Sequence, residues 1–220
     1  MTNCKYLDLR HKWPRPGGRS LERFLSGNKD LVCLSVTDCR ENIEAVQFLT
    51  DHCHQLELLR LLATDPLLPY KELHKLKSLK FLELQLDSFY REHRDDFIFH
   101  LAQLSQLQVL KVHCCYGMRE DHVLHILETC PTITHLLLPL NARITGWFLE
   151  TLLENRKQKK INNLKYLSCT INTAYVDLLT VIPQLYVNTI KDELIHLGLR
   201  LDIDFVHNKL QSFNPKSFLC

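Results

Sequence analysis

Two short runs, 52–54 and 113–115, combine histidine with cysteine, the residue types that most often bind zinc in proteins. A structural zinc site takes four ligands, usually as two pairs separated by two to four residues. Neither run has such a spacing, and neighbouring residues on a strand point to opposite faces of a sheet. The pair His122 and His125 likewise lacks a third ligand. We therefore expect no metal site.

Catalytic motifs are also missing from the chain. There is no G-x-S-x-G, no H-E-x-x-H and no glycine-rich phosphate loop, and Gly17-Gly18 beside Pro16 predicts a turn. With only six glycines in 220 residues, a backbone cradle for phosphate is not expected. We expect a protein without enzymatic activity and without a cofactor.

Composition narrows the class of partner. The net charge of +2 gives no general preference for nucleic acid, although the first 30 residues are more basic and offer Tyr6 and Trp13 for stacking on RNA, a weaker alternative. Apolar runs are too short to cross a bilayer, and the amino terminus lacks a secretory pattern. The chain has nine cysteines, an odd number, and because most of them occupy positions of the repeat described below we expect reduced thiols. We expect a cytoplasmic or nuclear protein that binds neither membrane nor nucleic acid.

The dominant pattern is a nine-residue motif, L-x-x-L-x-L-x-x-N/C, with starts at residues 4, 31, 56, 79, 107, 133, 164 and 194. The copy at 107 has Leu107, Leu110, Val112 and Cys115. The last copy is assigned to Leu194, Leu197, Leu199 and Asp202, with His196, Gly198 and Arg200 facing outward. The starts are about 27 residues apart on average, a period within or near the range of leucine-rich repeats.

Each copy alternates like a strand with one buried face, and the segments between copies carry helical spacing. Examples of the helical stripes are Phe97, Leu101 and Leu104, and Val123, Leu127 and Cys130. The pattern predicts an α/β leucine-rich-repeat solenoid of about eight repeats, curved, with parallel strands on the concave face and helices on the convex face. We expect one domain over residues 1–220, with 1–30 an incomplete or terminal first repeat and 206–220 a carboxyl-terminal tail.

A cysteine at the end of a helix, followed by the next strand, occurs at 53–59 and 130–136. This arrangement resembles the cysteine-containing leucine-rich repeats of the F-box substrate-receptor family of ubiquitin ligases, over roughly residues 4–205. The resemblance implies the substrate-recognition part of a ligase whose other subunits are a Skp adaptor and a cullin. No F-box fits before Leu7, so we expect a fragment or isoform whose ligase contacts lie in a missing or longer-isoform segment, or a ligase-independent scaffold or inhibitor.

The strand alternation also predicts which side chains face outward on the concave side. Apolar residues gather in the middle repeats, and charges of alternating sign flank them. The predicted partner-binding residues are Leu58, Arg60, Leu62, Phe81, Glu83, Val109, Lys111, His135, Leu137 and Tyr166. Exposed apolar patches of this kind usually mark a protein partner, and alternating charges can select its register. The alternative is that a loop or the carboxyl-terminal tail covers the patch.

Overall fold

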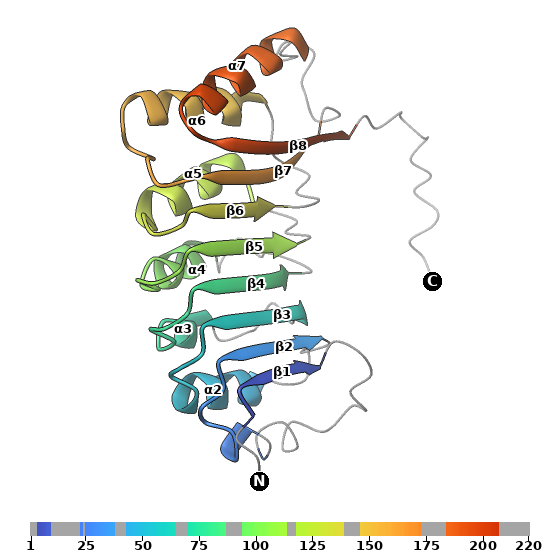
Figure 1. Cartoon of the computed structure of the whole chain (residues 1–220), viewed down its shortest axis with the longest axis vertical. Coiled ribbons are helices and arrows are strands. Elements are labelled where there is room, and N and C mark those ends of the chain that lie inside the picture. Colours follow the sequence, from blue (N-terminus) through green and yellow to red (C-terminus); the bar gives the residue numbers. More distant parts are fainter. Residues whose placement is uncertain are drawn as a thin grey trace.

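The computed structural model describes residues 4–9, 23, 25–37, 43–64, 70–86, 94–113, 118–138, 146–172 and 184–206. These residues form one eight-stranded sheet in which strands adjacent in sequence are adjacent in space and every pairing is parallel (Figure 1). The strands are β1 (Tyr6–Leu9), β2 (Cys33–Thr37), β3 (Leu58–Thr64), β4 (Phe81–Leu86), β5 (Val109–His113), β6 (His135–Leu138), β7 (Tyr166–Asn172) and β8 (Arg200–Val206).

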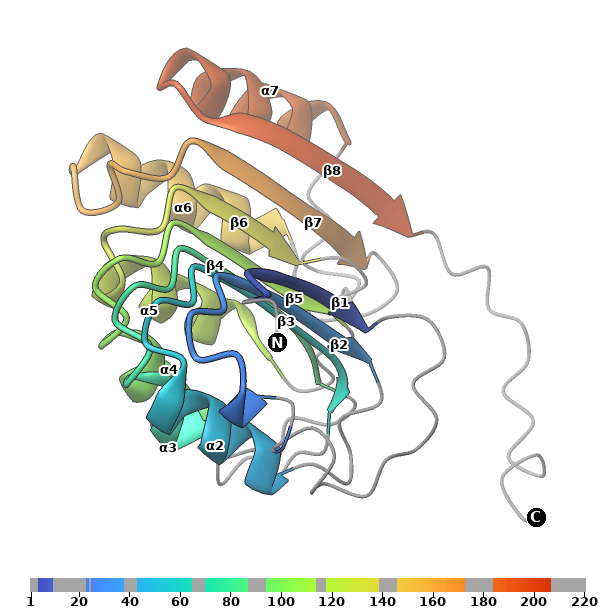
Figure 2. The same cartoon turned by 60° about the horizontal axis from the view of Figure 1, so that its bottom comes forward.

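Helices follow the strands and lie together on one side of the sheet, as the two views in Figures 1 and 2 show. They are α2 (Ile43–His52), α3 (Tyr70–Leu73), α4 (Arg94–Leu101), α5 (Glu120–Thr129), α6 (Gly146–Lys157) and α7 (Gln184–His196). Successive strands contact one another along the whole sheet, and among the helices α2 contacts α3, α3 contacts α4, α4 contacts α5 and α6 contacts α7. The result is an α/β architecture that is compatible with a solenoid, because each strand–helix unit packs on the next one.

The core lies between the sheet and the helices and consists of the side chains that the alternation predicts to be inward. Strand β5 shows the pattern: Leu110 and Val112 are buried, whereas Val109, Lys111 and His113 are partly exposed. The predicted helical stripes are buried as well, including Phe97, Leu101, Leu104, Val123, Leu127 and Cys130. We call the other side of the sheet, which carries Val109 and Lys111, the outer face.

A repeated hydrogen-bond arrangement holds neighbouring strands in register. The carbonyl group just before one strand accepts two N–H groups at the start of the next strand: Glu57 O accepts from Lys80 and Phe81, and Lys80 O accepts from Gln108 and Val109. The same pair of bonds recurs from β1 through β7. Equivalent residues therefore lie side by side, and the first outward position runs from Tyr6 to Tyr166 as the sequence predicts.

The assignment of the last copy is wrong. Tyr166 pairs with Arg200, and His196 is the last residue of α7 rather than an outward residue of a strand. Leu197, predicted to be in the core, is 42% exposed. The amides of Leu199 and Gly198 donate to the carbonyls of Leu194 and Ile195, and Gly198 has φ of 80°.

This set of bonds is a Schellman motif, in which glycine takes the left-handed conformation that ends a helix. Leu194 and Leu199, on either side of the turn, are both buried, as the hydrophobic contact of this motif requires. Leu194 and Leu199 thus belong to the end of a helix and not to a strand. Gly198 is the residue of the sequence that favours the helix end.

Helix α6 ends in the same way, with Lys159 at φ of 61° in the left-handed position. The preceding Arg156 donates hydrogen bonds to the carbonyls of Leu164 (2.8 Å) and Leu197 (2.6 Å). Arg156 therefore ties the turn before β7 to the turn before β8. Its neighbour Lys157 forms an ion pair with Glu193 of α7.

Candidate functional site

The predicted partner-binding residues all lie on the outer face, and the strand register brings them together. Leu58, Phe81, Val109, His135 and Tyr166 are direct neighbours on β3 to β7. Each of these five side chains is partly buried, with some of its surface open to solvent. They form a row of mostly apolar and aromatic groups across the middle of the sheet.

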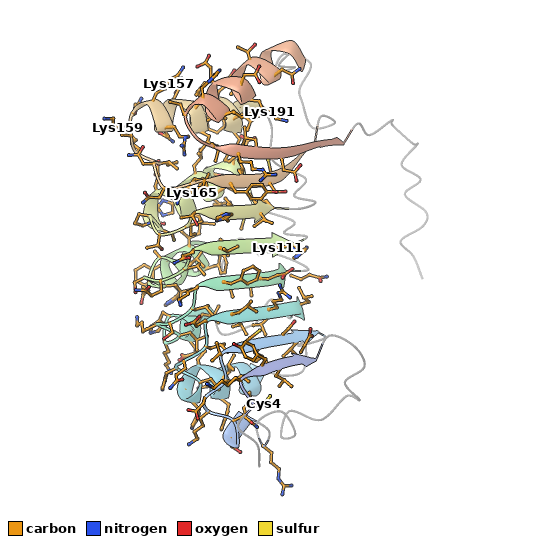
Figure 3. All side chains as sticks on the ribbon, in the orientation of Figure 1. Cys4, Lys111, Lys157, Lys159, Lys165 and Lys191 are labelled. Atoms are coloured by element: carbon orange, nitrogen blue, oxygen red, sulfur yellow. The ribbon has the colours of Figure 1, made fainter. Side chains whose placement is uncertain are left out.

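The second outward position carries charge in the same three central strands. Arg60, Glu83 and Lys111 are aligned by the pairing of β3, β4 and β5. Glu83 Oε1 lies 2.9 Å from Lys111 Nζ and 2.7 Å from His113 Nε2. Glu83 Oε2 lies 3.0 Å from Arg60 Nε. We call these four residues the Glu83 cluster; Figure 3 labels Lys111 within it.

The contacts in the Glu83 cluster are of two kinds. The bonds from Lys111 and His113 are hydrogen bonds, whereas the N–H of Arg60 Nε is not aligned with the carboxylate, so that contact is an ion pair. Because a carboxylate only accepts, the Nε2 of His113 carries the proton in this contact. Burial alone would raise the pKa of Glu83, but the hydrogen bonds from His113 and Lys111 and the charge of Lys111 outweigh it and hold the pKa below its ordinary value.

The acidic and the basic side chains of the Glu83 cluster differ in their exposure to solvent. The Glu83 side chain is 9% exposed, whereas those of Arg60 and Lys111 are 30% and 29% exposed. The guanidinium of Arg60 also lies over the ring of Phe81, 5.2 Å from the ring centre. This cation–π contact and the ion pair with Glu83 fix the position of the guanidinium. The acid is thus covered by side chains, and the bases are presented to solvent.

Glu83 was predicted to flank the apolar residues as one of the charges of alternating sign. In the structure its carboxylate contacts three basic neighbours, and the residue as a whole is 7% exposed. Sequence analysis also omitted His113 from the site. Its position two residues after Lys111 on the same strand places it on the same face and could have identified it.

Beyond the cluster, the outer face continues through aromatic and polar side chains. The rings of His135 and Tyr166 lie with centroids 5.9 Å apart. The Tyr166 hydroxyl donates a hydrogen bond to Asp202 of β8, and His135 Nδ1 lies 2.8 Å from Thr134 Oγ1. This half of the face is therefore ordered by its own contacts. Of the remaining predicted residues, Leu62 follows Arg60 on β3 and Leu137 of β6 is paired with Lys111; both are partly exposed.

On the other side of the cluster, Ser35 of β2 is paired with Arg60 in register and is only 2% exposed. Its hydroxyl oxygen has no hydrogen-bond partner. Tyr6 of β1, by contrast, is 72% exposed. Along the outer face, exposure to solvent is thus high at Tyr6 of β1, low at Ser35 of β2 and intermediate at the first outward residues of β3 to β7.

Three further properties concern the residues that the structure describes: metal binding, membrane spanning and the state of the cysteines. Within it, no three His, Cys, Asp or Glu side chains are grouped so that they could hold a metal ion; Cys114 and Cys115 lie outside it. Among the same residues, no helix has the length and apolar character needed to cross a membrane. Among the described cysteines, Cys4, Cys53 and Cys130 are free thiols.

A second concave feature lies at the amino-terminal ends of β5, β6 and β7. It is a shallow polar pocket lined by Ser105, Gln106, Gln108, Pro131, Thr132, Thr134, Asn163 and Lys165. Asn163 already donates to the carbonyl of Pro131, and Lys165 is the one charged residue among those that line the pocket. The basic residues of the run 156–160 lie beyond it around the end of α6, where Figure 3 labels Lys157 and Lys159. The outer face is the stronger candidate.

Comparisons with known proteins do not assign a family or a function to this chain. No protein-family model matches the chain, and no curated protein sequence matches it. The fold and the outer face therefore stand as the observations from which a function can be argued.

Proposed function

We propose that this chain is a non-enzymatic protein-binding module of the leucine-rich-repeat type, which holds a protein partner on the outer face of its sheet. The observation that carries the proposal is the row of Leu58, Phe81 and Val109, three apolar side chains that are neighbours on three strands and stay partly open to solvent. Contiguous exposed apolar groups rimmed by polar groups are typical of protein-interaction sites.

Two features support the leucine-rich-repeat type. The leucines of the motif, such as Leu82, Leu84 and Leu110, point inward from parallel strands and are fully buried. Among the described residues, each strand pairs only with the strands next to it in sequence, which is the construction principle of a repeat protein. A sheet of this kind presents one broad surface, and recognition by such proteins takes place over several strands at once.

The partner class follows from the resemblance to F-box substrate receptors, and it is part of the same proposal. The helix-end cysteines on which the resemblance rests, Cys53 and Cys130, are both buried free thiols. On this proposal the outer face holds a substrate of a ubiquitin ligase whose other subunits are a Skp adaptor and a cullin. A ligase-independent scaffold or inhibitor would use the same face without these subunits.

Affinity purification from cells followed by mass spectrometry tests the proposal. The wild-type chain is compared with the Leu58→Asp/Phe81→Asp double variant, which places two carboxylates in the apolar row. A matched control is Phe99→Asp on α4, since Phe99 is 63% exposed and lies on a helix instead of the sheet. Circular dichroism and thermal unfolding establish that all three proteins are folded.

We expect at least one partner to be retained by the wild type and by Phe99→Asp and to be lost from the double variant. Identical partners for all three folded proteins would contradict binding on the outer face. The presence of the Skp adaptor and the cullin with a longer isoform would support the ligase assignment, and their absence from both forms would leave the scaffold or inhibitor.

A further inference from the structure

The Glu83 cluster does not balance its own charge. Arg60 and Lys111 each carry one positive charge, Glu83 carries one negative charge, and one positive charge remains even with His113 neutral. Among the described side chains on the outer face of β2 to β6, Glu83 is the only acidic one; the neighbouring outward positions are Ser35, Leu58, Leu62, Phe81, Gln85, Val109, His135 and Leu137. A second anion would complete the cluster.

Hydrogen-bond donors are also left over, and they belong to the exposed members of the cluster. Arg60 contacts Glu83 through Nε, and its two terminal amino groups have no ion-pair or hydrogen-bond partner among the residues that the structure describes. Lys111 gives one hydrogen bond to Glu83 and has two further N–H groups. Because Phe81 and Glu83 already hold the guanidinium in place, a ligand that binds it does not have to order the side chain first.

The shape of the surroundings indicates what kind of molecule brings the anion. The cations adjoin the row of Leu58, Phe81 and Val109, so an anion seated on Arg60 and Lys111 is next to an apolar surface. A polypeptide in extended conformation offers this combination, since acidic and apolar side chains can follow one another along it. A carboxylate carries the single negative charge that the cluster lacks, whereas a dianionic phosphate would exceed it and be repelled by Glu83.

We propose that the partner of this chain places an Asp or Glu carboxylate on Arg60 and Lys111, with an adjoining apolar side chain against Phe81 and Val109. This inference rests on the proposed function and specifies the chemistry of its partner. Arginine suits the task because its planar group binds a carboxylate through two parallel hydrogen bonds. Glu83 then has a positioning role: it lies on the strand between the two cations, holds each of them by an ion pair and offsets their mutual repulsion.

Selection from a random peptide library displayed on phage, with the full chain immobilised, tests the inference without a known partner. Three further proteins are used in parallel. The first is Arg60→Gln/Glu83→Gln/Lys111→Gln, which removes all three formal charges and so leaves no carboxylate or cation buried without its partner. The second is Leu58→Asp/Phe81→Asp, and the third is the control Phe99→Asp.

We expect peptides selected by the wild type and by Phe99→Asp to be enriched in Asp or Glu next to an apolar residue. The triple glutamine variant should select apolar peptides without acidic enrichment. Equal acidic enrichment on that variant, or neutral peptides on the wild type, would overturn the inference while leaving the proposed function intact. If the wild type selects no more peptides than Leu58→Asp/Phe81→Asp does, the proposed function fails and the inference fails with it.

The most enriched peptide is then synthesised with glutamate, glutamine or phosphoserine at its acidic position, and binding is measured by fluorescence anisotropy. We expect the glutamine form to bind the wild type about tenfold more weakly than the glutamate form, and both forms to bind the triple glutamine variant equally. Tighter binding of the phosphoserine form than of the glutamate form would replace the carboxylate by a phosphorylated side chain and contradict the inference.

Discussion

The two faces of the same strands are built on different rules. On the inner face of β4 and β5, Leu82, Leu84 and Leu110 have no exposed surface, and the residue type hardly changes from strand to strand. On the outer face of the same strands, Phe81, Glu83 and Lys111 differ in size, charge and exposure. The inner face meets the helices at close-packed density, where even one methylene group matters, whereas the outer face has no such constraint.

This difference indicates that the outer face, whose side chains are not constrained by core packing, is the part of the sheet that can carry functional residues. Uniform inward leucines stack one strand–helix unit on the next, and they fix the spacing and register of the first two outer positions from β1 to β7. Outer side chains then meet across strands in combinations that the repeat itself does not require. The Glu83 cluster, with members on β3, β4 and β5, is the clearest of these combinations.

The sharpest test of the comparison uses two adjacent residues of β5. We expect Leu110→Ala to lower the free energy of unfolding by roughly 2–5 kcal/mol, because it opens a cavity between sheet and helices. Val109→Ala on the outer face should cost about 1 kcal/mol or less, since the site is already partly open to water. Urea unfolding measures both values. Similar losses for the two variants would contradict the distinction between the faces.

Within the outer face, removal of the central acid should have an intermediate effect. Glu83→Ala leaves Arg60 and Lys111 close together without their anion, and we expect a loss of about 1–3 kcal/mol, reduced by the partial exposure of both cations. The exposed pair of Lys80 and Glu57, 2.8 Å apart, is the control. Glu57→Ala should cost less than about 1 kcal/mol. Equal costs in urea unfolding would show that the Glu83 cluster is no more than a surface ion pair.

Lowering the pH should reduce the contribution of Glu83 to the free energy of unfolding. Because the pKa of Glu83 in the folded protein lies below the ordinary value of 4.5, the ionised carboxylate stabilises the fold at higher pH. This contribution is complete above about pH 5 and is lost as the pH falls through the folded-state pKa.

The measurement is the difference in unfolding free energy between wild type and Glu83→Gln, followed from pH 7 to pH 3. Subtracting the variant removes the effect of the other carboxylates that titrate in this range. We expect the advantage of the wild type to shrink as the pH is lowered below 5. A constant or growing advantage would contradict the ionised state of Glu83.

The reactivity of the cysteines also tests the difference between the two faces of the sheet, and we expect this effect to be the smallest. Burial raises the pKa of the Cys53 and Cys130 thiols to about 11, so very little thiolate is present in the core at pH 8. Cys33 lies on the outer face of β2 and is partly exposed. We expect iodoacetamide to label Cys33 faster than Cys53 or Cys130 in the folded protein, with the difference lost in urea. Peptide mapping by mass spectrometry at several labelling times reads out each site.

Much of the fold could be predicted because it follows from periodicity. Alternation by two identifies Leu110 and Val112 as inward, and the spacing of the motif brings Phe81 beside Val109. The ends of the array were harder to predict, because leucine spacing at 194–199 satisfies both a strand and the end of a helix. Gly198 resolves the ambiguity only when its positive φ and the hydrogen bonds of the turn are considered.

The sequence by itself determined which residues of β1 to β7 share the outer face, including the ten of the predicted site, because side-chain direction in a strand depends only on position. It did not determine that Glu83 is buried beneath Arg60 and Lys111, that His113 joins them, or that the guanidinium lies over Phe81. These contacts were decided by the tertiary structure alone. They depend on how long side chains bend across neighbouring strands, and no linear pattern records the rotamers that place a charge within 3 Å of its partner.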